Sequence, residues 1–283
     1  MIYLLLSIFL FSFNNIFWKK NLEKVNIIFL VSYRAFFTSI IAFALANHFN
    51  SFNLLTSSQL VKVTIGSIFG VIGLLCMLTV IKKASLHWLG VYNLIGIIFS
   101  SSYLIWIEQF NFKYSIIGCL FIIAGFIYYV VSTKSKPIKI VLTQHLLLLL
   151  MTISFSISSI IHWKNLVISV PPLVILSNQE LIVFITSLLL LMFSKQKIIF
   201  NAYKSYFSKV ILMAFIIFLA LFFSFIGLKQ TNPIISSLLF LGSPITTIIL
   251  NIIFFKETLT KQNIFAILLM SVGAFILNYQ TNE

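Results

Sequence analysis

Two residues of opposite charge lie inside apolar segments of this chain, and their types and positions are the ones most suited to chemistry. Arg34, the only arginine of the sequence, falls in the apolar run 27–46. Glu180 falls in the run 173–193 and is the only glutamate well inside such a run, in a sequence that contains no aspartate. An ionisable side chain inside a membrane span is costly, so it faces a partner or a watery cavity and marks a functional site by default.

The depths of these two residues allow them to meet. At the rise of an α-helix, Arg34 and Glu180 each lie about 10 Å into their own run. If the two helices run in opposite directions, each charge lies about 10 Å from an opposite face of a hydrocarbon core of about 30 Å, and the two long side chains can meet in its middle part. Two interpretations stay open: a structural ion pair that locks two helices together, and a site for substrate binding or for proton coupling.

The elements that must position these residues are membrane helices. With 60% hydrophobic and 8% charged residues, the 283-residue chain has too few charges for a soluble domain. Its apolar runs are too long and too uniform for barrel strands, so we expect an all-α membrane protein with ten transmembrane helices. The runs are 2–18, 27–46, 63–81, 86–107, 115–131, 146–163, 173–193, 210–228, 233–255 and 264–279.

The chain also repeats a pattern of charged residues at nearly constant separation. The separations are 146, 147 and 149 residues, for the pairs Arg34 and Glu180, Lys82 and Lys229, and Glu108 and Glu257. The pattern predicts two five-helix repeats, 1–133 and 141–283, joined by a linker at 134–140. Because five is odd, the second repeat enters the membrane from the opposite side. Such inverted repeats are typical of secondary transporters, whose substrate site lies near the bilayer midplane; a duplication retained only for packing is the alternative.

Further polar residues inside the runs are candidates for the lining of a central cavity. Each has a structural alternative, namely hydrogen bonding or close packing between helices. Pro244 is a special case, because proline removes a backbone donor and kinks a helix, either as a hinge beside the site or as a purely structural bend. Together with Arg34 and Glu180, the candidates are Asn14, Asn15, Trp88, Tyr92, Asn93, Ser156, Asn178, Gln179 and Pro244.

The segment that begins with Gly242-Ser243-Pro244 and continues through an apolar stretch to Glu257-Thr258-Leu259-Thr260 resembles the EamA type of the drug/metabolite transporter superfamily. In the first half, Arg34, Lys82 and Glu108 match the family pattern more loosely. Two departures stand out: the first half has Tyr92-Asn93-Leu94 in place of the Ser-Pro pair, and the residues before the two glutamates are Ile107 and Lys256 instead of glycine.

The resemblance implies a ten-helix secondary transporter in the cytoplasmic membrane, with an exported small metabolite such as an amino acid as cargo. A multidrug exporter is the alternative within transport. An integral-membrane enzyme would need a cluster of carboxylates or histidines at one membrane face, and a scaffold is the third option. We expect no metal and no cofactor, because the four histidines are scattered and no phosphate-binding loop is present.

Composition and the family resemblance together give the expected partners. The net charge of +14 is explained by lysines in short loops beside lipid headgroups, so no nucleic acid is expected. The partners are the bilayer, a small-molecule substrate and a coupling proton or ion, and the chain acts as a monomer or a homodimer.

Overall fold

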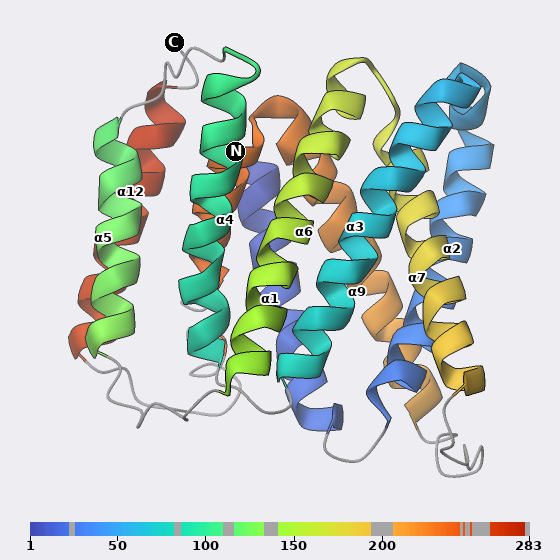
Figure 1. Ribbon diagram of the computed structural model, residues 1–283, viewed down its shortest axis with the longest axis horizontal. Helices are drawn as coiled ribbons and strands as arrows, with labels where there is room; N and C mark the ends of the chain where they lie inside the picture. Colours follow the sequence, from blue (N-terminus) through green and yellow to red (C-terminus); the bar gives the residue numbers. More distant parts are fainter. Residues whose placement is uncertain are drawn as a thin grey trace.

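The computed structural model describes residues 1–22, 26–81, 86–109, 116–132, 141–193, 206–243, 246, 250 and 261–280, and every regular element in them is a helix (Figure 1). This confirms the expected all-α class for the described residues. The elements are α1 (Ile2–Leu22), α2 (Ile27–His48), the 3-10 helix η1 (Ser51–Leu54), α3 (Ser57–Ile81), α4 (Leu86–Trp106), α5 (Ile116–Ser132), α6 (Leu142–Val167), α7 (Pro172–Phe193), α9 (Phe207–Gln230), α10 (Pro233–Phe240) and α12 (Lys261–Gln280).

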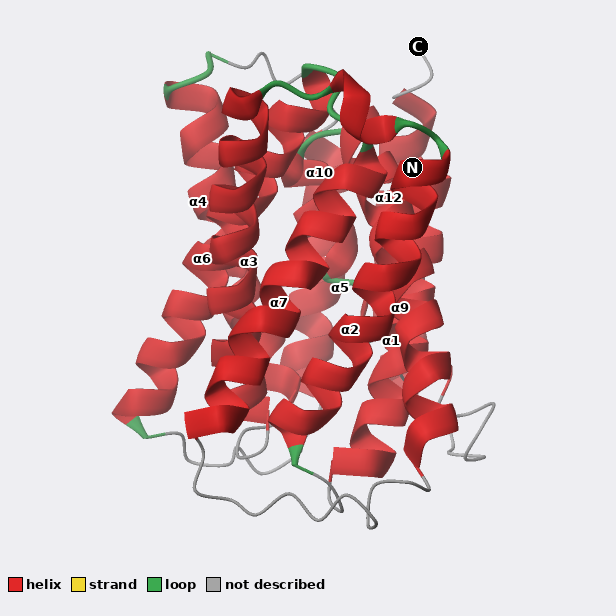
Figure 2. Ribbon diagram, turned by 90° about the vertical axis from the view of Figure 1, so that its right-hand side faces the viewer, coloured by secondary structure: helices red, strands yellow, loops and turns green. Residues whose placement is uncertain are grey.

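The long helices lie side by side along one direction, as a multi-pass membrane protein requires (Figure 2). In the described residues, five of them, α2, α3, α6, α7 and α9, are long and apolar enough to cross a bilayer. Helices α1, α4, α5 and α12 contain shorter apolar stretches.

Polar residues between the apolar runs act as helix caps. The side chain of Asn26 accepts a hydrogen bond from the Ile28 amide at 2.9 Å and caps α2, and Asn232 caps α10 in the same way. Helix α3 begins six residues before the apolar run that we predicted at 63–81. The reason is a reciprocal cap in which the Thr56 amide donates to the Gln59 side chain at 2.9 Å and the Gln59 amide donates to the Thr56 hydroxyl at 3.3 Å.

The ninth apolar run is not one regular helix. Helix α10 ends at Phe240, and the amides of Leu241 and Gly242 bond to carbonyls three residues back, at 3.2 and 2.9 Å, instead of four. The Ser12 hydroxyl of α1 donates to the carbonyl of Ser243 at 3.1 Å, directly after this break. A deviation near Gly242 was expected from Pro244; that proline itself lies outside the described residues.

Helices of the first half pack mainly against helices of the second half. The most extensive pairings are α2 with α7, α3 with α6, α5 with α12 and α1 with α9, followed by α4 with α6, α2 with α9 and α3 with α7. Figure 1 shows α5 and α12 as a pair at one side of the bundle and α2 and α7 at the other. The two sets of helices therefore share one interior.

Glycine allows a close approach between α5 and α12. A Cβ atom added to Gly273 would lie 2.7 Å from the carbonyl oxygen of Gly118 and 2.9 Å from the amide nitrogen of Ile122. A Cβ atom at Gly125 would lie 2.6 Å from the Met270 side chain. The backbones of α5 and α12 are thus in direct contact, as in other membrane helix pairs with small residues at the crossing.

Candidate functional site

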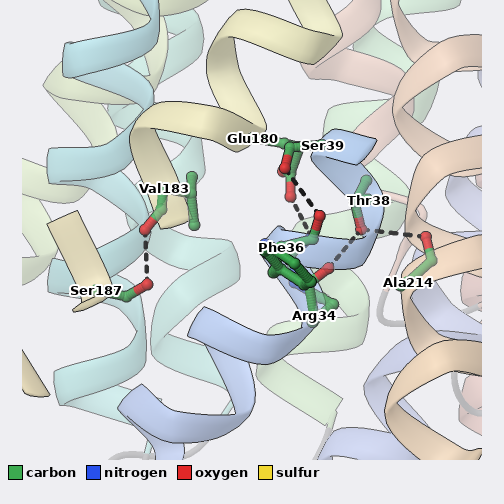
Figure 3. Close-up of polar contacts among 8 residues, drawn as sticks. All are labelled: Arg34, Phe36, Thr38, Ser39, Glu180, Val183, Ser187 and Ala214. Atoms are coloured by element: carbon green, nitrogen blue, oxygen red, sulfur yellow. Dashed lines mark hydrogen bonds and ion pairs between the residues drawn. The ribbon is translucent and has the colours of Figure 1, made fainter. Parts of the chain in front are cut away.

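Arg34 and Glu180 form an ion pair in the interior of the bundle. The Nη1 atom of Arg34, on α2, lies 2.8 Å from Oε2 of Glu180, on α7 (Figure 3). The side chains are only 5% and 3% exposed. Sequence spacing predicted that the two could meet, and the structure shows them in direct contact between the two halves of the chain.

Little else in the described residues neutralises this pair. Apart from the guanidinium, Glu180 Oε2 has no hydrogen-bond partner among them. The hydroxyls of Ser39 on α2 and Ser187 on α7 bond to carbonyls of their own helices, Ser39 to Phe36 and Ser187 to Val183 (Figure 3). Because desolvation of two charges is offset only by their mutual attraction, each partner is strongly dependent on the other.

Thr38 fixes the helix that carries Arg34. Its hydroxyl lies 2.8 Å from the carbonyl oxygen of Arg34, one turn earlier, and 3.2 Å from that of Ala214 on α9 (Figure 3). Thr38 is completely buried. Thr38 was not among the residues predicted from the sequence, although its position four residues after Arg34 places it on the same face of the helix.

The two polar residues before Glu180 face α3. The Asn178 amide donates to the Thr64 hydroxyl at 3.2 Å, and its Oδ1 atom has no hydrogen-bond partner among the described residues. The Gln179 side chain lies against Gly70. The polar turn of α7 therefore contacts protein on two sides, α2 and α3.

A second group of predicted residues lies where α4 packs on α6. The Ser156 hydroxyl donates to the Gly96 carbonyl at 3.1 Å, and Thr152 donates to the Tyr92 carbonyl at 3.0 Å. The Tyr92 hydroxyl is 2.7 Å from Nδ1 of His145, and Asn93 is half-buried. These hydrogen bonds join α4 to α6.

The other predicted residues are placed only in part. Asn14 is 1% exposed on α1, and its Oδ1 atom has no described partner. The side chains of Asn15 and Trp88 lie outside the described set, as does Pro244. Among described residues, no hydrogen bond or ion pair joins the Arg34 group to the Tyr92 group or to Asn14.

Two buried polar residues on α6 received no site role from the sequence. His162 is 1% exposed, packs against Gly66 and the Phe225 ring, and has no described hydrogen-bond partner at either ring nitrogen. Asn165 is also 1% exposed, and its Nδ2 atom has no described partner. Nothing in the sequence distinguishes Asn165 from an ordinary polar residue at the end of a helix, so it was not predicted as a site residue.

Glu108 lies just after the C-terminal end of α4 and has a lysine partner. It forms an ion pair with Lys164 of α6 and accepts a hydrogen bond from the Tyr103 hydroxyl at 3.0 Å. Donation by Lys164, followed by donation by Tyr103, lowers the pKa of Glu108 below its usual value. The pair joins the end of α4 to the end of α6.

This lowered pKa predicts a pH-dependent contribution to stability. We expect the pair to stabilise the protein at pH values above 4.5, the ordinary pKa of the glutamate, and to lose this effect as acid protonates the folded-state carboxylate below that value. The effect is small because both side chains are partly exposed. Thermal unfolding of the wild type and of Glu108→Gln, followed from neutral to acidic pH, checks this. A stability difference that persists unchanged below pH 4.5 would contradict it.

Comparison with known proteins identifies the second half of this bundle. Residues 142–279 match the EamA-like transporter family. The match confirms the resemblance that was drawn from the Gly242-Ser243-Pro244 segment, and it supports a membrane transporter over an enzyme.

The whole chain shares its fold with a solved structure. One of 28 matching chains, from a crystal structure described only as that of a protein, covers 99% of this chain and 96% of its own, with a TM-score of 0.78 and 13% sequence identity. That level of identity establishes the fold alone. No curated protein matches the chain significantly.

Proposed function

We propose that this EamA-like chain is a secondary transporter built from two inverted five-helix units, 1–133 and 141–283, joined at 134–140. The pattern of helix pairing supports the two units. If α1 to α5 correspond in order to α6, α7, α9, α10 and α12, then α2–α7 and α5–α12 are pairs of counterparts. When each helix is replaced by its counterpart, the pair α3–α6 becomes α9–α1, α4–α6 becomes α10–α1, and α3–α7 becomes α9–α2. All six of these pairs are in contact.

The buried Arg34–Glu180 pair carries the proposal for the site. It joins α2 to α7, which are counterparts, so it lies close to the pseudo-two-fold axis that relates the units. Alternating access requires contacts between the units to break and re-form around such a site. In a low-dielectric interior the pair is strong until another charge competes for one partner.

The cargo is therefore a small polar or amphipathic metabolite that carries a charge. A carboxylate of the cargo would compete for Arg34, and an ammonium group or a proton would compete for Glu180. Amino acids and related compounds carry both groups, and export from the cell is the proposed direction. Asn178 and Gln179, in the turn before Glu180, offer hydrogen-bonding groups next to the pair.

Flux measurements on purified protein in proteoliposomes test this proposal. A panel of labelled amino acids and related metabolites should contain at least one that the wild type accumulates, and Glu180→Gln should abolish its movement. Ser187→Ala is the matched control, since Ser187 is a buried residue of the same helix and bonds only within that helix. Transport restricted to apolar cations would favour a multidrug exporter. Full activity of Glu180→Gln would remove the ion pair from the site.

The orientation of the chain gives a separate prediction. Fourteen lysines fall in connections after the odd-numbered apolar runs, and only four, Lys62, Lys113, Lys164 and Lys229, after the even-numbered ones. The positive-inside rule then places both termini outside the cytoplasm, whereas the family resemblance implies the opposite. We expect the charge distribution to decide, because it acts directly on insertion. A reporter fused to the C-terminus that is active only in the cytoplasm should remain silent, and a strong signal would restore the family orientation.

A further inference from the structure

A groove at one end of the bundle combines free hydrogen-bond donors with an apolar wall. It has a volume of about 520 Å³ and is lined by residues where α4 and α6 end and α3 begins. These helix ends lie at the upper end of the view in Figure 1. Four of its lining residues are polar, namely Lys62, Glu108, Lys164 and Asn165, and the other five are apolar or aromatic. A ligand that fits both surfaces is amphipathic.

The polar side of the groove has more donors than acceptors to receive them. Asn165 is 1% exposed and its Nδ2 donor has no described partner, although buried donors are almost always paired. The ammonium group of Lys164 has three N–H donors, of which Tyr103, at 2.8 Å, and Glu108 accept two. Lys62, exposed on α3, forms no ion pair among the described residues. Each of the three side chains can therefore donate to an oxyanion.

The charge balance selects the kind of oxyanion. Lys62 and Lys164 contribute two positive charges and Glu108 one negative charge, which leaves a single positive charge. A phosphodiester carries one negative charge and matches it, whereas a phosphate monoester brings nearly two.

The position of the groove indicates that the phosphodiester belongs to a membrane lipid. Two of the polar residues belong to the last turns of α6 and one to the second turn of α3, so the donors lie at the level where a bilayer presents its headgroups. The apolar wall, which includes Ile65 and Val167, continues from there along the helices, where acyl chains lie. Neither Arg34 nor Glu180 lines the groove, so it is separate from the proposed transport site.

We propose that this groove binds the phosphodiester headgroup of an anionic membrane lipid. Lys62 and Lys164 pair with the phosphate, the Asn165 amide donates to one of its oxygens, and the acyl chains follow the apolar wall. Bound in this way, the lipid contacts the ends of α3 and α6 and the ion pair that ties α6 to Glu108.

Titration of the intact, purified protein with a defined lipid tests the site. Nanodiscs of phosphatidylcholine with increasing phosphatidylglycerol serve as the probe, and bound lipid is counted by native mass spectrometry after release of the protein. We expect Lys62→Gln to weaken phosphatidylglycerol retention roughly fivefold, which is the effect of one lysine near a lipid surface. Asn165→Leu should weaken retention as well, without loss of thermal stability in phosphatidylcholine alone.

The matched control is Lys229→Gln, which removes an exposed lysine from the last turn of α9 without touching the groove. It should leave retention unchanged. Equal losses for Lys62→Gln and Lys229→Gln would show attraction to overall charge and overturn the site. Inorganic phosphate is the second arm: displacement of the lipid by phosphate at concentrations equal to that of the lipid would overturn the lipid assignment and identify a site for free anions.

Discussion

Arg34→Ala should lower the free energy of unfolding by about 3–5 kcal/mol, the usual cost of removing one partner of a buried ion pair. The substitution leaves Glu180, 3% exposed and with no other described hydrogen-bond partner at Oε2, without its countercharge. Glu180→Ala should have an effect of similar size because Arg34 is then isolated. Chemical unfolding of the protein in a constant lipid or detergent environment measures both.

The double variant Arg34→Ala/Glu180→Ala should be less destabilised than the sum of the two single variants, because neither charge remains buried alone. Additive losses would mean that the two side chains act separately in spite of their 2.8 Å contact. Flux measurements then separate the two interpretations of the pair. If the double variant regains stability but not transport, the pair acts in transport, and if it regains both, the pair is a structural lock.

Gly273→Ala should also be strongly destabilising, by about 1–3 kcal/mol, as is usual for overpacking. The new Cβ atom would lie 2.7 Å from the carbonyl oxygen of Gly118 and 2.9 Å from the amide nitrogen of Ile122. Both are backbone atoms of α5, so no side chain can rotate away and the two helices have to separate. Thermal unfolding should show a decrease in midpoint of roughly 2–4 °C for each kcal/mol lost.

Gly242→Ala is the matched control for this substitution. Among the described residues, the one contact of its added Cβ atom within 4 Å is the Leu239 carbonyl oxygen at 3.1 Å, and the backbone there is already irregular. It should change the unfolding midpoint less than Gly273→Ala does. An equal or larger decrease for Gly242→Ala would show that the α5–α12 contact is not what limits stability.

The sequence was most informative at charged residues that lie in apolar segments. Arg34 and Glu180 were identifiable because a charge in an apolar run needs a partner. The all-helical class followed from run lengths, and the family resemblance of the second half followed from a short motif around Pro244. Each of these inferences depends on local composition.

Residues whose roles depend on long-range packing could not be recognised in this way. Thr38 contacts Ala214, and the Asn165 amide lines a groove with Lys62; nothing in the neighbouring sequence of either residue indicates those distant partners. The serine and asparagine residues of α4 and α6 would be equally suitable for lining a cavity and for packing two helices together, so residue type alone does not distinguish the two roles. In the structure, the Ser156 hydroxyl donates to the Gly96 carbonyl. Where such residues point is set by the arrangement of helices far apart in the chain.

The packing of first-half helices on second-half helices has a consequence for biosynthesis. None of the substantial contacts between described helices joins two of α1 to α5. During translation these helices therefore enter the bilayer before their main neighbours exist, and lipid has to solvate each of them alone. Glu180 is synthesised 146 residues after Arg34, which takes about 7–30 s at ordinary elongation rates. During that time Arg34 has no Glu180 to pair with in the nascent membrane helix. The chain therefore depends on the insertion machinery to accommodate this arginine until the seventh apolar run has been inserted.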